Sequence, residues 1–331
     1  MLVEYSIFED LAFLAVVIIL IVVNLKVHSS GKSVTLKDAA LWSVIWVAVS
    51  LLFAGYLDLF HGNKDAEVFL TGYLIEKVLS IDNLFIMMAV FSSFRIEDKY
   101  QHRVLYYGIL LALILRFIFV IAGAALIEFG GKFVSGLFGG MILWSAWKML
   151  QSSDLPQEGD VDYTKHPIVK FTSKFFPIYP HVENHDFFTK KAVPETSGNI
   201  AAKSQRWHAT PLFLCLIVLE LVDVVFAFDS VPAIFAITEK PFLVYSSSVF
   251  AILGLRSFYF LLAAAKRYLC HLEKSVVAIL VFIGGEMILG VLGIIEIEPL
   301  VSLGVITGII TTGVVASLIS SRGNSQTTSA M

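Results

Sequence analysis

The sequence predicts an all-α polytopic membrane protein. Of its 331 residues, 57% are hydrophobic and only 15% are charged, whereas soluble domains carry about 25% charged residues. The apolar residues gather in runs long enough to span a bilayer, which takes about 20 consecutive residues in a helix. The net charge of −3 offers no basic surface for nucleic acid. We therefore expect a multi-pass protein whose surroundings are lipid, with no nucleic-acid partner.

We expect about nine transmembrane helices. The N-terminal stretch is acidic and lacks the basic segment of a cleaved signal peptide, so the first helix is expected to be retained. The short polar tail after Arg322 is expected to be disordered. The helices are expected at residues 8–27, 39–60, 67–92, 104–127, 133–151, 211–237, 241–265, 275–295 and 299–320.

The basic residues alternate between the connections. Lysine and arginine cluster in the first, third and seventh connections and in the long fifth one, whereas the others hold at most one lysine each. By the positive-inside rule, the N-terminus is expected outside the cell, and the long loop and the C-terminus in the cytoplasm. The long loop at 152–210 is too mixed in composition for a bare linker, and we expect a short hairpin in it.

Two acidic segments inside apolar runs resemble each other. The first reads YLIEKVLSIDNLFIMMAVF from residue 73, and the second reads ELVDVVFAFDSVPAIFAIT from residue 220. When they are aligned, acids match acids at two positions, six residues apart in both copies. The matched pairs are Glu76 with Asp223, Asp82 with Asp229, and Asn83 with Ser230.

The repeat extends beyond these segments. Arg116 matches Arg256 in the helix that follows each acidic helix, and the glycines at 139 and 284 match one helix further on. A unit of three helices reverses direction from one copy to the next, so we expect an inverted repeat with its site near the membrane midplane. The expected organisation is helices 1–2 at 1–66, repeat 1 at 67–151, the cytoplasmic loop at 152–210, repeat 2 at 211–297, and helix 9 with its tail at 298–331.

The spacing within each copy limits how the acids can act together. Six residues turn an ideal helix by about 240°, so Glu76 and Asp82 do not share a face. Both can serve one site only if the helix is central or broken between them. Pro232 predicts a break in the second copy, because it cannot donate to the carbonyl of Phe228. Symmetry extends that expectation to the first copy.

The repeated segments supply a set of oxygen donors that could hold a cation. A charge at bilayer depth costs roughly 2.5–3.5 kcal/mol on insertion scales, so its presence favours a function. Oxygen ligands suit Mg²⁺, Ca²⁺ or Mn²⁺. The alternative is structural ion pairing with Arg116 and Arg256, although five acids outnumber two arginines. The candidate ligands are Glu76, Asp82, Asn83, Glu220, Asp223, Asp229 and Ser230.

These motifs carry a resemblance to a known family. EKVLSIDN from residue 76 and ATPLFLCLIVLELVDVVFAFDSVPAIFAIT from residue 209 resemble the two signature segments of the TerC/Alx family of bacterial membrane proteins. The similarity continues through FAILGLRSFYFLL from residue 250 and covers residues 72 to about 292, with a layout most like the Alx branch. The resemblance implies Mn²⁺ export and manganese homeostasis. It also implies that the seven candidate ligands line the ion path, with Mn²⁺ as the transported substrate and no permanently bound cofactor.

Two other readings compete with export. An intramembrane aspartyl protease would use two buried aspartates, here Asp82 and Asp229, but the sequence lacks the GxGD pattern of such enzymes, and we expect no enzymatic activity. A non-transporting stress protein, acting as a redox modulator or in tellurite resistance, would leave the duplicated acids unused. No CxxC or haem-ligand spacing supports redox chemistry.

The energy source of such a transporter can be inferred from the same acids. The sequence has no P-loop motif, so ATP is not the expected drive. Five carboxylates held close together in a low-dielectric site cannot all ionise, so some are expected to carry protons when the metal is absent. Metal arrival would displace those protons, which predicts proton antiport. The oligomeric state stays open at this point.

Overall fold

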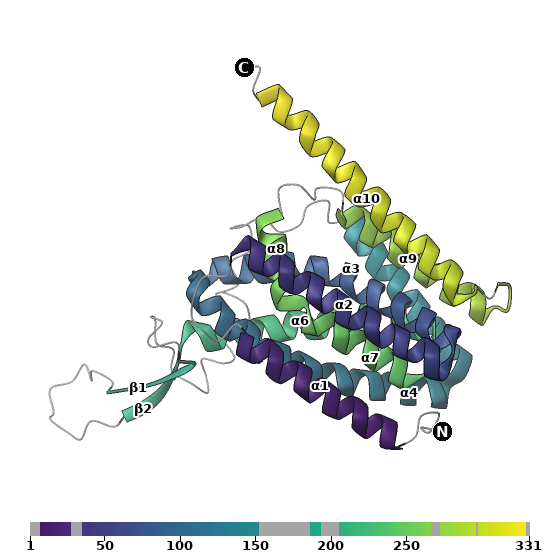
Figure 1. The fold of residues 1–331 in the computed structure, drawn as a ribbon, viewed down its shortest axis with the longest axis horizontal. Helices are drawn as coiled ribbons and strands as arrows, with labels where there is room; N and C mark the ends of the chain where they lie inside the picture. Colours follow the sequence, from purple (N-terminus) through teal and green to yellow (C-terminus); the bar gives the residue numbers. More distant parts are fainter. Residues whose placement is uncertain are drawn as a thin grey trace.

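The computed structural model describes residues 7–27, 35–151, 186–192, 205–265, 272–295 and 297–328. These residues form a bundle of helices with one small hairpin (Figure 1), so the prediction of an all-α polytopic membrane protein is confirmed. The helices are α1 (Ile7–Val27), α2 (Leu36–His61), α3 (Asn63–Ser93), α4 (Asp98–Gln151), α6 (Pro211–Phe235), α7 (Pro241–Leu253), α8 (Leu255–Ala265), α9 (Leu272–Val291) and α10 (Pro299–Thr328). The strands are β1 (Phe188–Ala192) and β2 (Gln205–Ala209).

Several of these helices are able to cross a membrane. Within the described residues, five segments are long and apolar enough, and the bent pair α7 and α8 makes a sixth. The five are Leu36–His61, Tyr100–Gln151, Pro211–Phe235, Lys274–Val291 and Pro299–Ser317. The count of nine spans and the inverted repeat therefore stay predictions, although each of the nine expected ranges falls on helix.

The chain bends at glycines rather than at proline. Gly131 takes a non-helical conformation (φ 49°, ψ −135°) inside α4 and divides it where two helices were predicted. α7 and α8 meet at 47° across Gly254. The break expected at Pro232 is wrong, since α6 continues through it and ends at Phe235. Only three residues of α6 follow the proline, so its missing N–H weakens a turn that is already the last one. α3 is continuous as well.

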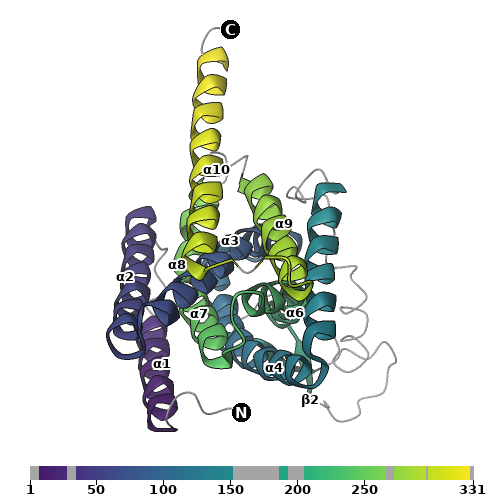
Figure 2. The same cartoon turned by 90° about the vertical axis from the view of Figure 1, so that its right-hand side faces the viewer.

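The two acidic helices lie in the middle of the bundle. α3 contacts α2, α6, α7 and α10, while α6 contacts α3, α4, α7 and α9. Figure 2 shows α1 and α2 on one side, α9 and the end of α4 on the other, and α3, α6 and α7 between them. Each helix of the first predicted repeat unit touches its counterpart in the second, because α3 contacts α6 and α4 contacts both α7 and α9.

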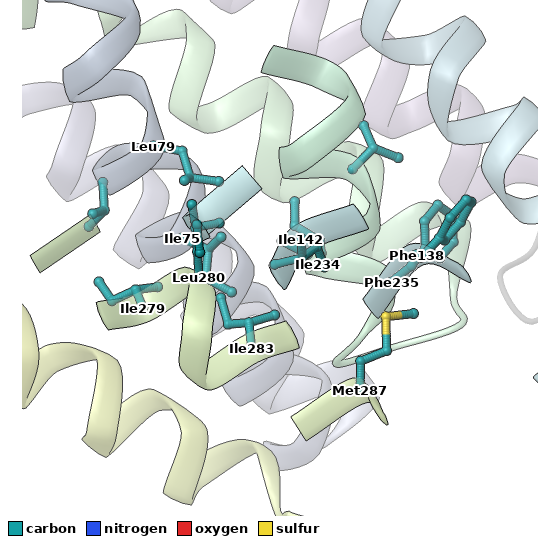
Figure 3. Packing of buried hydrophobic residues seen from close by; sticks show 14 of the residues in the cluster. Ile75, Leu79, Phe138, Ile142, Ile234, Phe235, Ile279, Leu280, Ile283 and Met287 are labelled. Atoms are coloured by element: carbon teal, nitrogen blue, oxygen red, sulfur yellow. The ribbon is translucent and has the colours of Figure 1, made fainter. Parts of the chain in front are cut away.

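A dry core joins α3, α4, α6 and α9. Figure 3 shows its side chains, which include Ile75, Ile142, Ile234 and Ile283. Next to this core α4 crosses α9 closely at the matched glycines, since a Cβ on Gly139 would lie 3.4 Å from the carbonyl oxygen of Gly284. Small residues allow such close backbone approach between membrane helices. This apolar packing fixes the relative positions of the helices that carry the acids.

The hairpin expected in the long loop is present in its described part. β1 and β2 pair antiparallel, with Phe188 opposite Ala209. Thr210, just before α6, donates its hydroxyl to the carbonyl of Asp186 at 2.8 Å, and Phe188 packs on Phe213 of α6. Arg103 of α4 lies 3.3 Å from Asp186. The hairpin is thus held against the ends of α4 and α6 and projects from the bundle (Figure 1).

The C-terminal tail differs from its prediction. α10 extends to Thr328, beyond Arg322 where disorder was expected to begin, and residues 329–331 lie outside the described part. Adding residues to an existing helix needs no new nucleus, so a polar segment can continue an apolar helix. This end of α10 extends past the rest of the bundle in Figure 2.

Side-chain pairs show which connections share an end of the bundle. Lys240 before α7 lies 3.0 Å from Asp65 at the start of α3, and His61 lies 3.7 Å from Glu9 at the start of α1. The Arg103–Asp186 pair joins the third connection to the long loop. These groupings agree with the predicted alternation of the connections, whereas the assignment of either end to the cytoplasm rests on the basic residues alone.

Candidate functional site

A buried arginine joins the two acidic helices. Arg116, on α4, donates from Nη1 to Oε1 of Glu76 on α3 and to Oγ of Ser230 on α6, the latter at 2.6 Å. The same Glu76 oxygen accepts a hydrogen bond from Ser248 on α7 at 2.7 Å. Both charged side chains are 3% exposed. The Arg116–Glu76 pair therefore ties together four helices, two from each predicted repeat unit.

A small cavity lies beside this contact. It holds about 20 Å³, room for one water molecule or one bare metal ion. Glu220, Asp223 and Arg256 line it, together with Gly108 of α4, whose added Cβ would lie 3.2 Å from Glu220 Oε1. Glu220 Oε2 is buried and has no hydrogen-bond partner among the described residues. The lining thus offers carboxylate oxygens with unused capacity.

Electrostatic interactions connect the cavity to the arginine contact. Asp223 is attracted by Arg116 and repelled by Glu76, and Glu220 and Asp223 repel each other. Glu220 and Asp223 are each 8% exposed. Unpaired charges in such an environment are expensive, so these carboxylates need either a cation or a proton.

Asp229 lies apart from these groups. It is partly exposed and accepts a hydrogen bond from Ser145, in the second half of α4, at 2.7 Å. Lys148 of the same helix interacts with it electrostatically. Because α6 is unbroken, Asp223 and Asp229 face different parts of the protein. Six residues turn an ideal helix by about 240°, which accounts for this separation.

The remaining candidates are on α3. Asn83 is 7% exposed, and its Oδ1 has no hydrogen-bond partner among the described residues. The backbone of Asp82 lies in α3, but its side chain is outside the described part of the structure. In that described part, no group of three His, Cys, Asp or Glu side chains is close enough to hold a metal ion. The structure thus brings Glu76, Asp223, Glu220 and Ser230 to one region and leaves Asp229 at another.

The sequence analysis missed Lys77. Its Nζ donates to the carbonyl oxygen of Ala251 at 2.9 Å, just before the α7–α8 bend. The amide of Asn24 donates to the carbonyl of Leu253 at the same bend. A cation at the end of a helix stabilises the exposed carbonyls and the helix dipole. Lys77 therefore supports the bend through its hydrogen bond and also interacts electrostatically with Glu76, the carboxylate next to it in sequence.

Two serines were also missed. Ser248 and Ser145 donate to Glu76 and Asp229 respectively, yet neither belongs to the repeated acidic segments. Ser248 ends a run of three serines in an apolar helix, and that run was the available signal. Ser145 is a lone serine between aromatic residues, and nothing in the sequence distinguishes it.

Comparisons with known proteins identify the family of this chain. Residues 61–325 match the integral membrane protein TerC family. The tellurium resistance protein TerC of Serratia marcescens is 44% identical over 322 residues, which cover 93% of this chain and 92% of that protein. A second tellurium resistance protein TerC, from an Alcaligenes species, is 43% identical over 93% of this chain and 92% of its own length. No solved structure matches.

The Alx branch is represented less strongly. The putative membrane-bound redox modulator Alx of Escherichia coli (strain K12) is 38% identical over 308 residues, 90% of each chain. The expectation of a layout most like the Alx branch is therefore not favoured, since the TerC proteins are more similar. By sequence, this chain belongs to the TerC family of integral membrane proteins.

Proposed function

We propose that this chain is a secondary transporter that exports Mn²⁺ from the cytoplasm through the region between α3 and α6. The observation that carries the proposal is the cavity lined by Glu220 and Asp223 beside the Glu76–Arg116 contact. Buried carboxylates with unused oxygens at membrane depth mark ion paths. The donors are hard oxygens, which suit Mn²⁺ better than Zn²⁺ or Cu²⁺.

The two predicted repeat units provide the direct test. Asp82→Asn and Asp229→Asn each keep the size of the side chain and remove its charge. We expect both variants to reach the membrane and to lose Mn²⁺ efflux, measured as cellular manganese in a strain that lacks other exporters. Variants that still protect cells from excess manganese would contradict the assignment of these residues.

Proton antiport is the proposed drive. The carboxylates that bind the metal would take up protons when the metal leaves, since like charges in a low-dielectric site cannot all stay ionised. Purified protein in liposomes should then move protons opposite to Mn²⁺, and an imposed pH gradient should drive Mn²⁺ against its concentration. Mn²⁺ flux without proton movement would indicate a channel-like path instead.

The proposal fixes an orientation. With the lysine- and arginine-rich connections in the cytoplasm, the N-terminus is periplasmic and the protein resides in the inner membrane. A reporter placed after Arg322, or within the long loop near Glu195, should report the cytoplasm. A periplasmic signal from the long loop would overturn the orientation and the odd number of helices per repeat unit.

The names of the relatives favour a second candidate. Those proteins are named for tellurium resistance or as putative redox modulators, and this chain could act in stress resistance without transport. Cys215, the one cysteine in the described residues, is buried within α6 and carries no disulfide. If Asp229→Asn abolished tellurite resistance while cellular manganese stayed normal, this second function would be the better account.

A further inference from the structure

We propose that Arg116 is the counter-cation of the empty transporter: its guanidinium occupies oxygens that the transported cation needs, and each displaces the other during the cycle. The inference rests on the proposed cation transport. It concerns a residue that the sequence analysis treated only as a structural partner of the acids.

The contacts of Arg116 are contacts with candidate cation ligands. Its Nη1 donates to Glu76 and Ser230, and Asp223 interacts with it electrostatically. All three belong to the set of oxygen donors that the repeat predicts. A guanidinium and a divalent ion cannot use the same oxygens at once, because their charges repel and the lone pairs are already engaged. Metal binding to this set therefore requires Arg116 to leave it.

The neighbouring cavity provides a place where the exchange can begin. A cation in that cavity would meet Glu220, whose Oε2 lacks a partner, and Asp223. Asp223 would then interact with the metal in place of Arg116. The described hydrogen bonds of Arg116 all use Nη1, and its Nε has no partner among the described residues. The guanidinium is thus held at one end, which favours its release.

The matching arginine of the second repeat unit has a different role. Arg256 also lines the cavity, but its Nη2 donates to the backbone carbonyl of Asn24 on α1 at 3.2 Å. No hydrogen bond from Arg256 to a carboxylate occurs in the described residues. The exchange is therefore assigned to Arg116 alone.

This role separates two kinds of transport. When Mn²⁺ is present on both sides, the protein can carry it in both directions. Every conformational change then takes place with Mn²⁺ bound. Net export requires the metal-free protein to return, with protons on some carboxylates and with Glu76 buried beside Arg116 in place of the metal. If Arg116 neutralises the empty site, its removal should slow net export and leave Mn²⁺/Mn²⁺ exchange intact.

The test compares both activities in liposomes that contain purified wild-type protein, Arg116→Gln or Arg116→Lys. We expect Arg116→Gln to keep exchange of radioactive Mn²⁺ and to lose net transport by about tenfold or more, the effect of a modestly higher barrier. Its affinity for Mn²⁺ should rise, because a competing cation is gone. Arg116→Lys keeps the charge and should resemble the wild type in all three measurements.

The outcomes distinguish the inference from the proposed function. Wild-type vesicles that show neither exchange nor net transport would overturn both. Wild-type vesicles with both activities, beside an Arg116→Gln protein that loses them equally and binds Mn²⁺ no more tightly, would overturn the inference alone. Lys240→Gln, which removes a basic residue at the end of the bundle, is the matched control and should change neither activity.

A measurement on the wild-type protein covers the case in which Arg116→Gln does not fold. Phenylglyoxal modifies arginines that leave their partners, and mass spectrometry reports the extent at each site. Mn²⁺ should increase the labelling of Arg116 and leave that of Arg256 unchanged, whereas Mg²⁺-free, Mn²⁺-free buffer gives the baseline. Labelling of Arg116 that stays at baseline or falls when Mn²⁺ saturates the protein would overturn the inference.

Discussion

Arg116 and Arg256 occupy matching positions in the predicted repeat, yet they hold different parts of the molecule together. Arg116 bonds a carboxylate and a hydroxyl from two helices, whereas Arg256 bonds the backbone of α1. The cavity opens on the side of Arg256, Asp223 and Glu220. The Arg116 contact and the cavity thus lie at different places between the same two predicted units.

Other residues at matching positions of the two predicted units also differ in their hydrogen bonds. Ser230 completes the contact of Arg116, but Asn83, which matches Ser230 in the other unit, leaves its Oδ1 without a partner in the described residues. α1 lies outside the repeat, and its contact with Arg256 is one source of the asymmetry. Matching sequence positions therefore indicate shared chemistry, while the elements outside the repeat decide which contact forms.

The largest expected effect is on stability. Arg116→Leu leaves Glu76 buried and without its cation, and breaking a buried pair in this way costs about 3–5 kcal/mol. Arg256→Leu loses a charged hydrogen bond to a carbonyl, about 1.5–3 kcal/mol, and is partly offset because a buried guanidinium no longer needs desolvation. Thermal unfolding in detergent, together with the yield of monodisperse protein, should rank the variants in this order. Equal losses would mean that the two arginines have equivalent roles.

Some features of the structure could be predicted from the sequence and others could not. Apolar runs predicted most helix bounds to within a few residues, because the bilayer imposes length and composition on each helix. The start of α4 and the end of α10 were missed, because polar residues continue the helix there. Spacing predicted that Glu76 and Asp82 would not share a face of an unbroken helix, and the same rotation separates Asp223 from Asp229 because α6 is continuous. The hydroxyl partners of Glu76 and Asp229 could not be predicted, because Ser248 and Ser145 reach them only through the packing of α7 and of the second half of α4. The break predicted at Pro232 was wrong because the prediction did not include the position of the proline, which lies three residues before the end of α6.

The next largest expected effect is on the cavity that Glu220 lines. Gly108→Ala places a Cβ about 3.2 Å from Glu220 Oε1, so Glu220 must shift and the cavity must narrow. We expect the affinity for Mn²⁺ to fall about fivefold, which corresponds to roughly 1 kcal/mol. Gly140→Ala is the control, because nothing lies within 4 Å of its added Cβ. Both changes favour the helix by up to about 1 kcal/mol, so Mn²⁺ titration rather than stability separates them. An unchanged affinity for the Gly108 variant would place the metal outside this cavity.

The smallest effect concerns an ion pair with the same charges as Arg116 and Glu76 but with more solvent around it. Lys240 Nζ lies 3.0 and 3.2 Å from the two oxygens of Asp65, and the side chains are 36% and 12% exposed. Water and ions screen such a pair, so Lys240→Gln should cost no more than about 1 kcal/mol, and less at high salt. Thermal unfolding at low and high ionic strength measures this, with Lys64→Gln as an exposed control at the same end of the bundle. A loss as large and as salt-independent as that of Arg116→Leu would show that burial is not what distinguishes the two pairs, and that the charge of any residue joining α3 to its neighbours matters equally. We expect the opposite, because the low dielectric around Glu76 makes an unmatched charge there costly. The same cost is the reason that a mobile cation is proposed at that carboxylate.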